Sequence, residues 1–208
     1  MSYEPYTSDE LTHFVGRRCP TDDERCYNLL LKILQEGRLK AGGIPGAGGE
    51  AASGPMLSIT GPGKISDATA IRGQIVCFCD IPLSGLGLHV KKYGCFGVAF
   101  RKPFLVTRGA NPVFYVVKDS MLPGNQVLPT GSGSLEVSRD ITRAEIMDRI
   151  MEREWRVYGD VLFAVRDVAR IILPDAYTDR FRGELPDYSG PLFEVRLPLA
   201  TAAHIRDN

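Results

Sequence analysis

The apolar residues of this chain gather in short segments of strand length, and this pattern limits the possible folds most. Residues 74–79 form a near-continuous apolar run, which is typical of a strand covered on both faces. Residues 154–158 alternate between polar and apolar, which is typical of a strand with one buried face. Similar patterns predict strands at 11–15, 95–100, 113–117, 168–173 and 192–197.

Helix signals stand between these segments. Residues 21–24 and 142–145 have the S/T-x-x-E pattern of a capping box, so helices are expected to begin there and to end near Gly37 and Arg153. A shorter helix is expected over residues 82–92, after a proline that suits a first helical turn. Several strands with few helices predict an α+β fold.

Two polar stretches interrupt the pattern. Residues 42–73 hold nine glycines and few aromatic residues, which indicates a long surface loop or a mobile flap. A second polar loop is expected over residues 121–138. At 208 residues the chain is short enough that a single domain, 1–208, with these two loop insertions is the simplest organisation.

Charge and cysteine content exclude some classes of protein. Lysine plus arginine equals aspartate plus glutamate at 25 each, so no global charge points to nucleic acid or membrane, although a local basic patch remains compatible with this balance. The five cysteines lack zinc-ribbon spacing and indicate reduced, mostly buried side chains. No leader segment and no apolar run of about 20 residues is found, so a cytoplasmic protein is expected.

His13 interrupts an otherwise apolar strand. One interpretation is a histidine at the edge of the core that bonds a backbone carbonyl. The other is a hydrogen-bonding group at a cleft. The three histidines are far apart and none has HxxxH or HExxH spacing, so no metal site is expected.

Glu154 opens a strand beside the only tryptophan. Its carboxylate could be solvated or paired with Arg156. If the strand lines a cleft, the carboxylate could instead bond a ribose hydroxyl and stabilise the oxocarbenium-like transition state of glycosidic bond cleavage. The polar segment 80–94 is equally compatible with a solvated connection and with a substrate site.

Several words of the sequence resemble the abortive-infection AbiGi family of bacterial phage-resistance proteins. They are LTHFVGR (11–17), LLLKIL (29–34), VCFCDIPL (76–83), HVKKYGCFGVAF (89–100), GANPVFY (109–115) and EWRVY (154–158). The family is usually described as an abortive-infection component and often labelled an antitoxin. That resemblance implies a partner protein, a cognate toxin or antitoxin encoded beside it.

A second, weaker resemblance is to the ADP-ribosyltransferase fold of nucleic-acid-modifying toxins. It rests on His13 in the first strand, on NLLLKILQEGRL (28–39) and on Glu154 at the start of a late strand. It implies two packed, mainly antiparallel sheets with flanking helices and the long glycine-rich loop. The Ser-Thr-Ser form of the second motif is absent, which implies the His-x-Glu type.

The first functional hypothesis is therefore an NAD-dependent ADP-ribosyltransferase toxin of an abortive-infection system, acting on RNA, DNA or protein. The resemblance implies Glu154 as the catalytic residue, NAD as co-substrate and no metal. NAD would be bound by His13, Phe14, Arg17, Tyr93 and Phe96, and the acceptor by Arg18, Lys92 and Arg156. The 42–73 flap would exclude water from the cleft.

The alternative hypothesis is a non-catalytic antitoxin or binding partner. It predicts an apolar patch on the surface and does not require His13 and Glu154 to face each other. A third, weaker hypothesis is a small-molecule hydrolase that uses Glu154 on NAD or another nucleoside.

Overall fold

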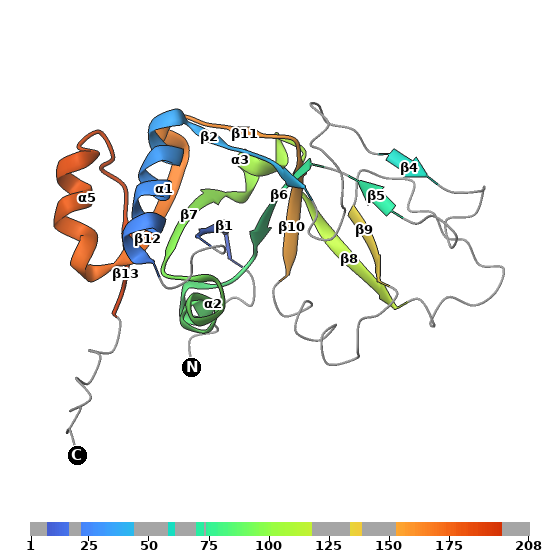
Figure 1. Cartoon of the computed structure of the whole chain (residues 1–208), viewed down its shortest axis with the longest axis horizontal. Coiled ribbons are helices and arrows are strands. Elements are labelled where there is room, and N and C mark those ends of the chain that lie inside the picture. Colours follow the sequence, from blue (N-terminus) through green and yellow to red (C-terminus); the bar gives the residue numbers. More distant parts are fainter. Residues whose placement is uncertain are drawn as a thin grey trace, which may run out of the picture.

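The computed structural model describes residues 8–16, 22–43, 58–60, 70–72, 74–117, 134–138 and 153–196, and Figure 1 shows the arrangement of their helices and strands. Nine of the described strands form one main sheet. Eight follow the order β13-β12-β7-β1-β6-β10-β8-β9, and β3 also pairs with β6. In chain order these strands are β1 (Glu10–Val15), β3 (Gly42–Gly43), β6 (Gln74–Cys79), β7 (Phe96–Arg101), β8 (Asn111–Val117), β9 (Ser134–Ser138), β10 (Glu154–Tyr158), β12 (Val168–Pro174) and β13 (Leu192–Val195).

Most neighbouring strands are antiparallel. Within the described part of the chain, the parallel pairs of the main sheet are β12 with β13 and β8 with β9. The prediction of an α+β fold with mainly antiparallel strands is confirmed. The two packed sheets implied by the ADP-ribosyltransferase resemblance are not found, because the described strands of both halves join in one sheet. The finer likeness to that fold stays a prediction.

The two halves of the main sheet meet at β1. On one edge β1 pairs with β7 at every position from Glu10 to Val15. On the other edge it pairs with β6 at Thr12, opposite Cys79. Two side-chain bonds reinforce this edge: the Cys79 thiol donates to the Thr12 carbonyl within the same pair, and the His13 ring donates to the Cys77 carbonyl. Such a short join leaves no signal in hydrophobic periodicity.

Two short ribbons accompany the main sheet. β2 (Arg38–Leu39) pairs with β11 (Val161–Leu162), and β4 (Ser58–Thr60) pairs with β5 (Ala70–Arg72). The predicted loop 42–73 thus contains β3, β4 and β5, and the predicted loop 121–138 contains β9. Strands of two to five residues were missed because so short a segment shows no clear period. The rest of both loops lies outside the described residues.

The helices of the described residues are short except for the first. They are α1 (Asp23–Glu36), α2 (Leu86–Tyr93), α3 (Lys102–Val106) and α5 (Thr178–Glu184), with 3-10 turns η2 (Leu83–Gly85), η4 (Val165–Asp167) and η5 (Asp175–Tyr177). The strand and helix predictions at 82–92, 95–100 and 168–173 are confirmed to within a few residues. The helix predicted to begin at 142–145 lies outside the described residues.

Both ends of α1 have a local cause. The Asp22 side chain accepts a hydrogen bond of 3.0 Å from the Arg25 amide, so the N-cap is Asp22 rather than the predicted Thr21. The predicted end near Gly37 is confirmed, and Gly37 has a left-handed conformation with φ of 60°. A Cβ atom at Gly37 would also lie 2.5 Å from the Phe163 carbonyl oxygen, so close packing favours glycine there as well.

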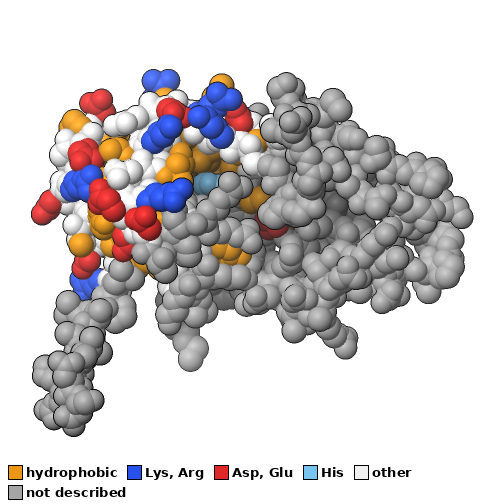
Figure 2. Space-filling view, viewed as in Figure 1, with side chains coloured by type: hydrophobic (Ala, Val, Ile, Leu, Met, Phe, Trp, Pro, Cys, Tyr) orange, Lys and Arg blue, Asp and Glu red, His pale blue; other side chains and the backbone are white. Residues whose placement is uncertain are grey.

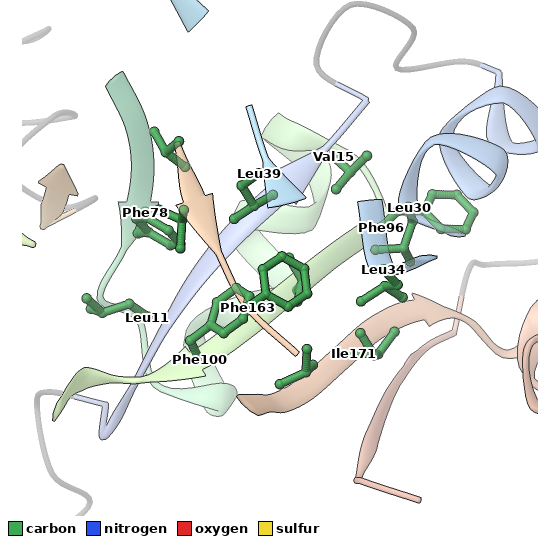
Figure 3. Packing of buried hydrophobic residues seen from close by; sticks show 14 of the residues in the cluster. Leu11, Val15, Leu30, Leu34, Leu39, Phe78, Phe96, Phe100, Phe163 and Ile171 are labelled. Carbon is green, nitrogen blue, oxygen red and sulfur yellow. The ribbon is translucent and has the colours of Figure 1, made fainter. Parts of the chain in front are cut away.

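One face of the main sheet, called the core face, packs against α1. Leu30 and Leu34 of α1 lie near Phe96 and Ile171, and Phe100 lies beside Phe163 (Figure 3). The helix α5 completes this layer next to α1, where the Tyr27 hydroxyl donates to the Glu184 carboxylate over 2.9 Å. These buried aromatic and aliphatic side chains form the main hydrophobic core.

The opposite face, called the polar face, is covered in part by α2. Leu86 and Val90 of α2 pack there on Ile172 of β12 and Val195 of β13. The sequence did not predict α3 or α5. In α3, Pro103 lies in the first turn, which suits a helix start because that position needs no amide donor.

Candidate functional site

A row of paired residues crosses the polar face over five strands. Arg170 of β12 lies opposite Ala99, Ala99 opposite Thr12, Thr12 opposite Cys79 and Cys79 opposite Glu154. Directly opposed residues point to the same side of a sheet, so all five share one face. Small side chains thus occupy the middle of the row and charged ones its two ends.

The charged residue at each end of this row forms an ion pair with a neighbouring side chain. Arg156 donates from Nε to Glu154 Oε1 over 2.8 Å and from Nη2 to Glu154 Oε2 over 3.1 Å. The side chains of this pair are only 11% and 13% exposed. At the other end, Arg170 bonds both carboxylate oxygens of Glu10. Both carboxylate oxygens of Glu154 therefore accept from a guanidinium, which favours the interpretation of Glu154 as a structural ion pair.

Cys77 lies next to this pair and was not singled out from the sequence. It is opposite Arg156 in the register of β6 and β10. Although Cys77 is an exposed residue, desolvation by the surrounding protein and the nearby Glu154 carboxylate raise the pKa of its thiol to about 12. The thiol is therefore protonated at neutral pH and is a poor nucleophile.

Asp80 anchors the end of β6, in the segment that the sequence left open between a connection and a substrate site. Its buried carboxylate accepts from the Ser8 amide over 2.9 Å and from Lys102 Nζ over 2.8 Å. Lys102 begins α3, and its amide also donates to the Asp9 carbonyl. The group ties three chain segments together, which favours a structural role.

His13 lies on the core face, opposite to Glu154. It directly follows Thr12, and successive residues of a strand point to opposite faces. Its ring meets Phe78 edge-on at a centroid distance of 5.8 Å, and Nδ1 donates to the Cys77 carbonyl over 2.8 Å. Desolvation lowers the pKa of His13, so the neutral ring with a proton on Nδ1 fits this bond.

The structure does not bring His13 and Glu154 into one cleft. The NAD site that the ADP-ribosyltransferase resemblance implies needs both side chains at one cleft. That arrangement is not found, since β6 lies between β1 and β10 and the two side chains lie on opposite faces. A hydrophobicity pattern could not reveal this, because the face on which a residue lies depends on strand register.

The other residues assigned to NAD lie in different surroundings. Phe14 stacks on Tyr93 at a centroid distance of 5.8 Å, so the structure brings these two together on the polar face near α2. Phe96 is a fully buried core residue between Tyr27 and Tyr177, where a ligand cannot reach it. This assignment to an NAD site is therefore wrong.

The assigned basic residues give less information. Arg156 pairs with Glu154, and Lys92 belongs to α2. Arg17 and Arg18 lie outside the described residues. In the described part of the chain, no three histidine, cysteine, aspartate or glutamate side chains are grouped to hold a metal ion. Within the same residues, no helix is long and apolar enough to cross a membrane.

Comparison with known proteins gives one match. Residues 64–146 match the model of the family described as "Putative abortive phage resistance protein AbiGi, antitoxin". The resemblance to the AbiGi family is confirmed. The matched part includes β6, α2, β7, α3, β8 and β9, and it leaves out β1 and β10, which carry His13 and Glu154. No curated protein and no solved structure matches the chain.

The AbiGi match overturns the first functional hypothesis. The family is described as an antitoxin, whereas that hypothesis made this chain an ADP-ribosyltransferase toxin. The prediction of a catalytic toxin is therefore wrong, and the alternative of a non-catalytic antitoxin agrees better with the match. The resemblance to ADP-ribosyltransferases finds no support in the comparisons, and NAD as a co-substrate stays untested.

Proposed function

We propose that this chain is the antitoxin of an abortive phage-resistance system and acts in the cytoplasm by binding a toxin encoded beside it. The match of residues 64–146 to a family described as an antitoxin carries this proposal. An antitoxin of this kind acts through a binding surface and needs no catalytic group.

The contacts of the candidate residues support a binding role. Glu154 is held by Arg156 through two hydrogen bonds, and His13 holds the Cys77 carbonyl on the opposite face. Both side chains therefore have a structural task that accounts for their position. A mechanism that needs both of them at one reacting centre is not required to explain either residue.

Co-expression tests the proposal directly. The neighbouring protein is induced in a bacterial host with and without this chain, and growth and complex formation are measured. We expect the neighbour alone to arrest growth, this chain to restore it, and the two proteins to elute together in size-exclusion chromatography.

Two results would contradict the proposal. One is growth arrest by this chain alone, which would make it a toxin. The other is restored growth without a complex, which would point to an enzymatic antidote. The variant Phe100→Asp, which places a charge at a fully buried core position, serves as the control for an unfolded protein.

A further inference from the structure

The two most exposed large apolar side chains of the described residues belong to β11 and α3. Leu162 of β11 is 63% exposed and Val106, the last residue of α3, is 51% exposed. Single exposed apolar residues are common on protein surfaces. These two are of interest because one arginine joins their segments.

That arginine is Arg108, whose side chain is fixed on both sides. Its Nε donates to the Leu162 carbonyl over 3.1 Å, and its Nη1 donates to the Phe104 carbonyl over 3.1 Å. The guanidinium carbon also lies 3.5 Å from the centroid of the Phe104 ring. A side chain that is already held loses less conformational entropy when a partner binds.

Two arginines near Leu162, Arg108 in space and Arg166 in the sequence, form no ion pair with a carboxylate among the described residues. Arg166 is exposed in η4, the turn after β11. Arg38, on the strand that pairs with β11, is by contrast bound to Asp160. Figure 2 shows lysine and arginine side chains beside hydrophobic ones in the region of β2 and β11.

We propose that Val106, Arg108, Leu162 and Arg166, named here the β11–α3 surface, form the docking site for the toxin, an inference that rests on the proposed function. Charge complementarity sets the chemistry of the partner surface, which presents an apolar patch flanked by carboxylates. Arginine with an apolar neighbour is a frequent anchor of protein interfaces, and a carboxylate can bind its guanidinium through two hydrogen bonds.

The same features argue against nucleic acid as the occupant. Single strands are bound by exposed aromatic rings and a continuous basic groove. The exposed apolar residues here are aliphatic, and the Phe104 ring is covered by Arg108. Asp160 beside Arg38 adds a negative charge that a phosphate backbone would have to approach.

The test uses the neighbouring protein as the probe, with isothermal titration of this chain and its variants. Leu162→Asp and Arg108→Glu are expected to weaken binding by about tenfold or more, as is usual for interface anchors. Leu29→Asp and Arg25→Glu on α1 are the matched controls, since Leu29 is exposed and no carboxylate contacts the exposed Arg25. They are expected to change binding by less than about twofold.

Thermal unfolding of each variant shows whether it is folded. Arg108→Glu also removes the hydrogen bonds from Arg108 to two backbone carbonyls, whereas Leu162→Asp leaves Arg108 and both carbonyls in place. Weaker binding by both variants therefore cannot be due to the loss of these bonds alone. If the wild type binds and both variants bind equally well, the surface is wrong and the proposed function stands. If the variants instead change the sedimentation of the chain alone, the surface joins two copies and the proposal is overturned. If the wild type itself does not bind, the proposed function fails as well.

Discussion

The two edges of β1 are built in different ways. Towards β7 a continuous ladder runs from Glu10 to Val15, and core residues such as Phe100 pack beneath it. Towards β6 one residue pair is followed by bonds from the side chains of His13 and Cys79. His13, a candidate ligand-binding residue from the sequence, thus holds β1 to β6 through its side chain at an edge where one residue pair is formed.

The largest expected loss of stability follows from a change beside the edge between β1 and β7. Phe100→Ala removes a fully buried ring that contacts Phe78 and Phe163, so we expect a loss of about 3–5 kcal/mol in the free energy of unfolding. Urea unfolding measures it. Leu29→Ala, on the exposed face of α1, is the control, and a loss below about 1 kcal/mol for Phe100→Ala would contradict the packing described.

The next largest loss of stability is expected when the ion pair between Glu154 and Arg156, beside β6, is broken. Glu154→Ala leaves the largely buried Arg156 guanidinium without its carboxylate, which should cost about 1–3 kcal/mol of stability. Replacing both residues, as in Glu154→Leu with Arg156→Met, should recover most of the loss. If the double variant is less stable than the single one, the pair is not the reason for the effect.

A somewhat smaller loss is expected for His13→Ala, about 1–2 kcal/mol, because the Cys77 carbonyl loses its donor. In His13→Ala, amide hydrogen exchange should be faster at the edge between β1 and β6 than at the edge between β1 and β7. Equal protection of both edges in the variant would show that His13 does not hold β1 to β6.

The same histidine predicts a dependence on pH. Its pKa is lowered in the folded chain, so the unfolded chain binds the proton more readily. The stabilisation is present above the ordinary histidine pKa of about 6.5 and is lost as pH falls through the lower, folded pKa. Chemical unfolding between pH 7.5 and 5 should show a steeper loss for the wild type than for His13→Gln, and parallel curves would refute the assignment.

The smallest effect concerns reactivity rather than stability. The raised pKa of Cys77, to about 12, predicts slow alkylation of this exposed thiol by iodoacetamide at pH 7.5. Glu154→Gln removes the neighbouring negative charge and should speed the reaction. Peptide mass spectrometry follows the modified residue, and an unchanged rate in the variant would remove Glu154 as a cause.

Much of the fold could be predicted from the sequence. Strands such as residues 74–79 and 154–158, and the end of α1 at Gly37, follow from local patterns that depend on neighbouring residues only. Three features could not be predicted: the single sheet, the two-residue strands, and the position of His13 and Glu154 on opposite faces of the sheet. Each depends on register between distant segments, such as Thr12 with Cys79, which no local pattern encodes.

The candidate site shows the same limit. The sequence left both alternatives open for His13 and for Glu154, and the simple ones agree with the structure: a backbone carbonyl for His13 and Arg156 for Glu154. The NAD site required both residues on one face. Asp80 and Cys77 gained their partners Lys102 and Glu154 only through the pairing of strands far apart in the chain.

The most direct test of the central claim, that this chain neutralises by binding rather than by catalysis, is growth rescue by Glu154→Gln in cells that produce the neighbouring toxin. The glutamine can still accept a hydrogen bond from Arg156, and thermal unfolding checks that the variant is folded. We predict rescue equal to that by the wild type, with the same complex in size-exclusion chromatography. Loss of rescue by a folded variant that still forms the complex would contradict the claim.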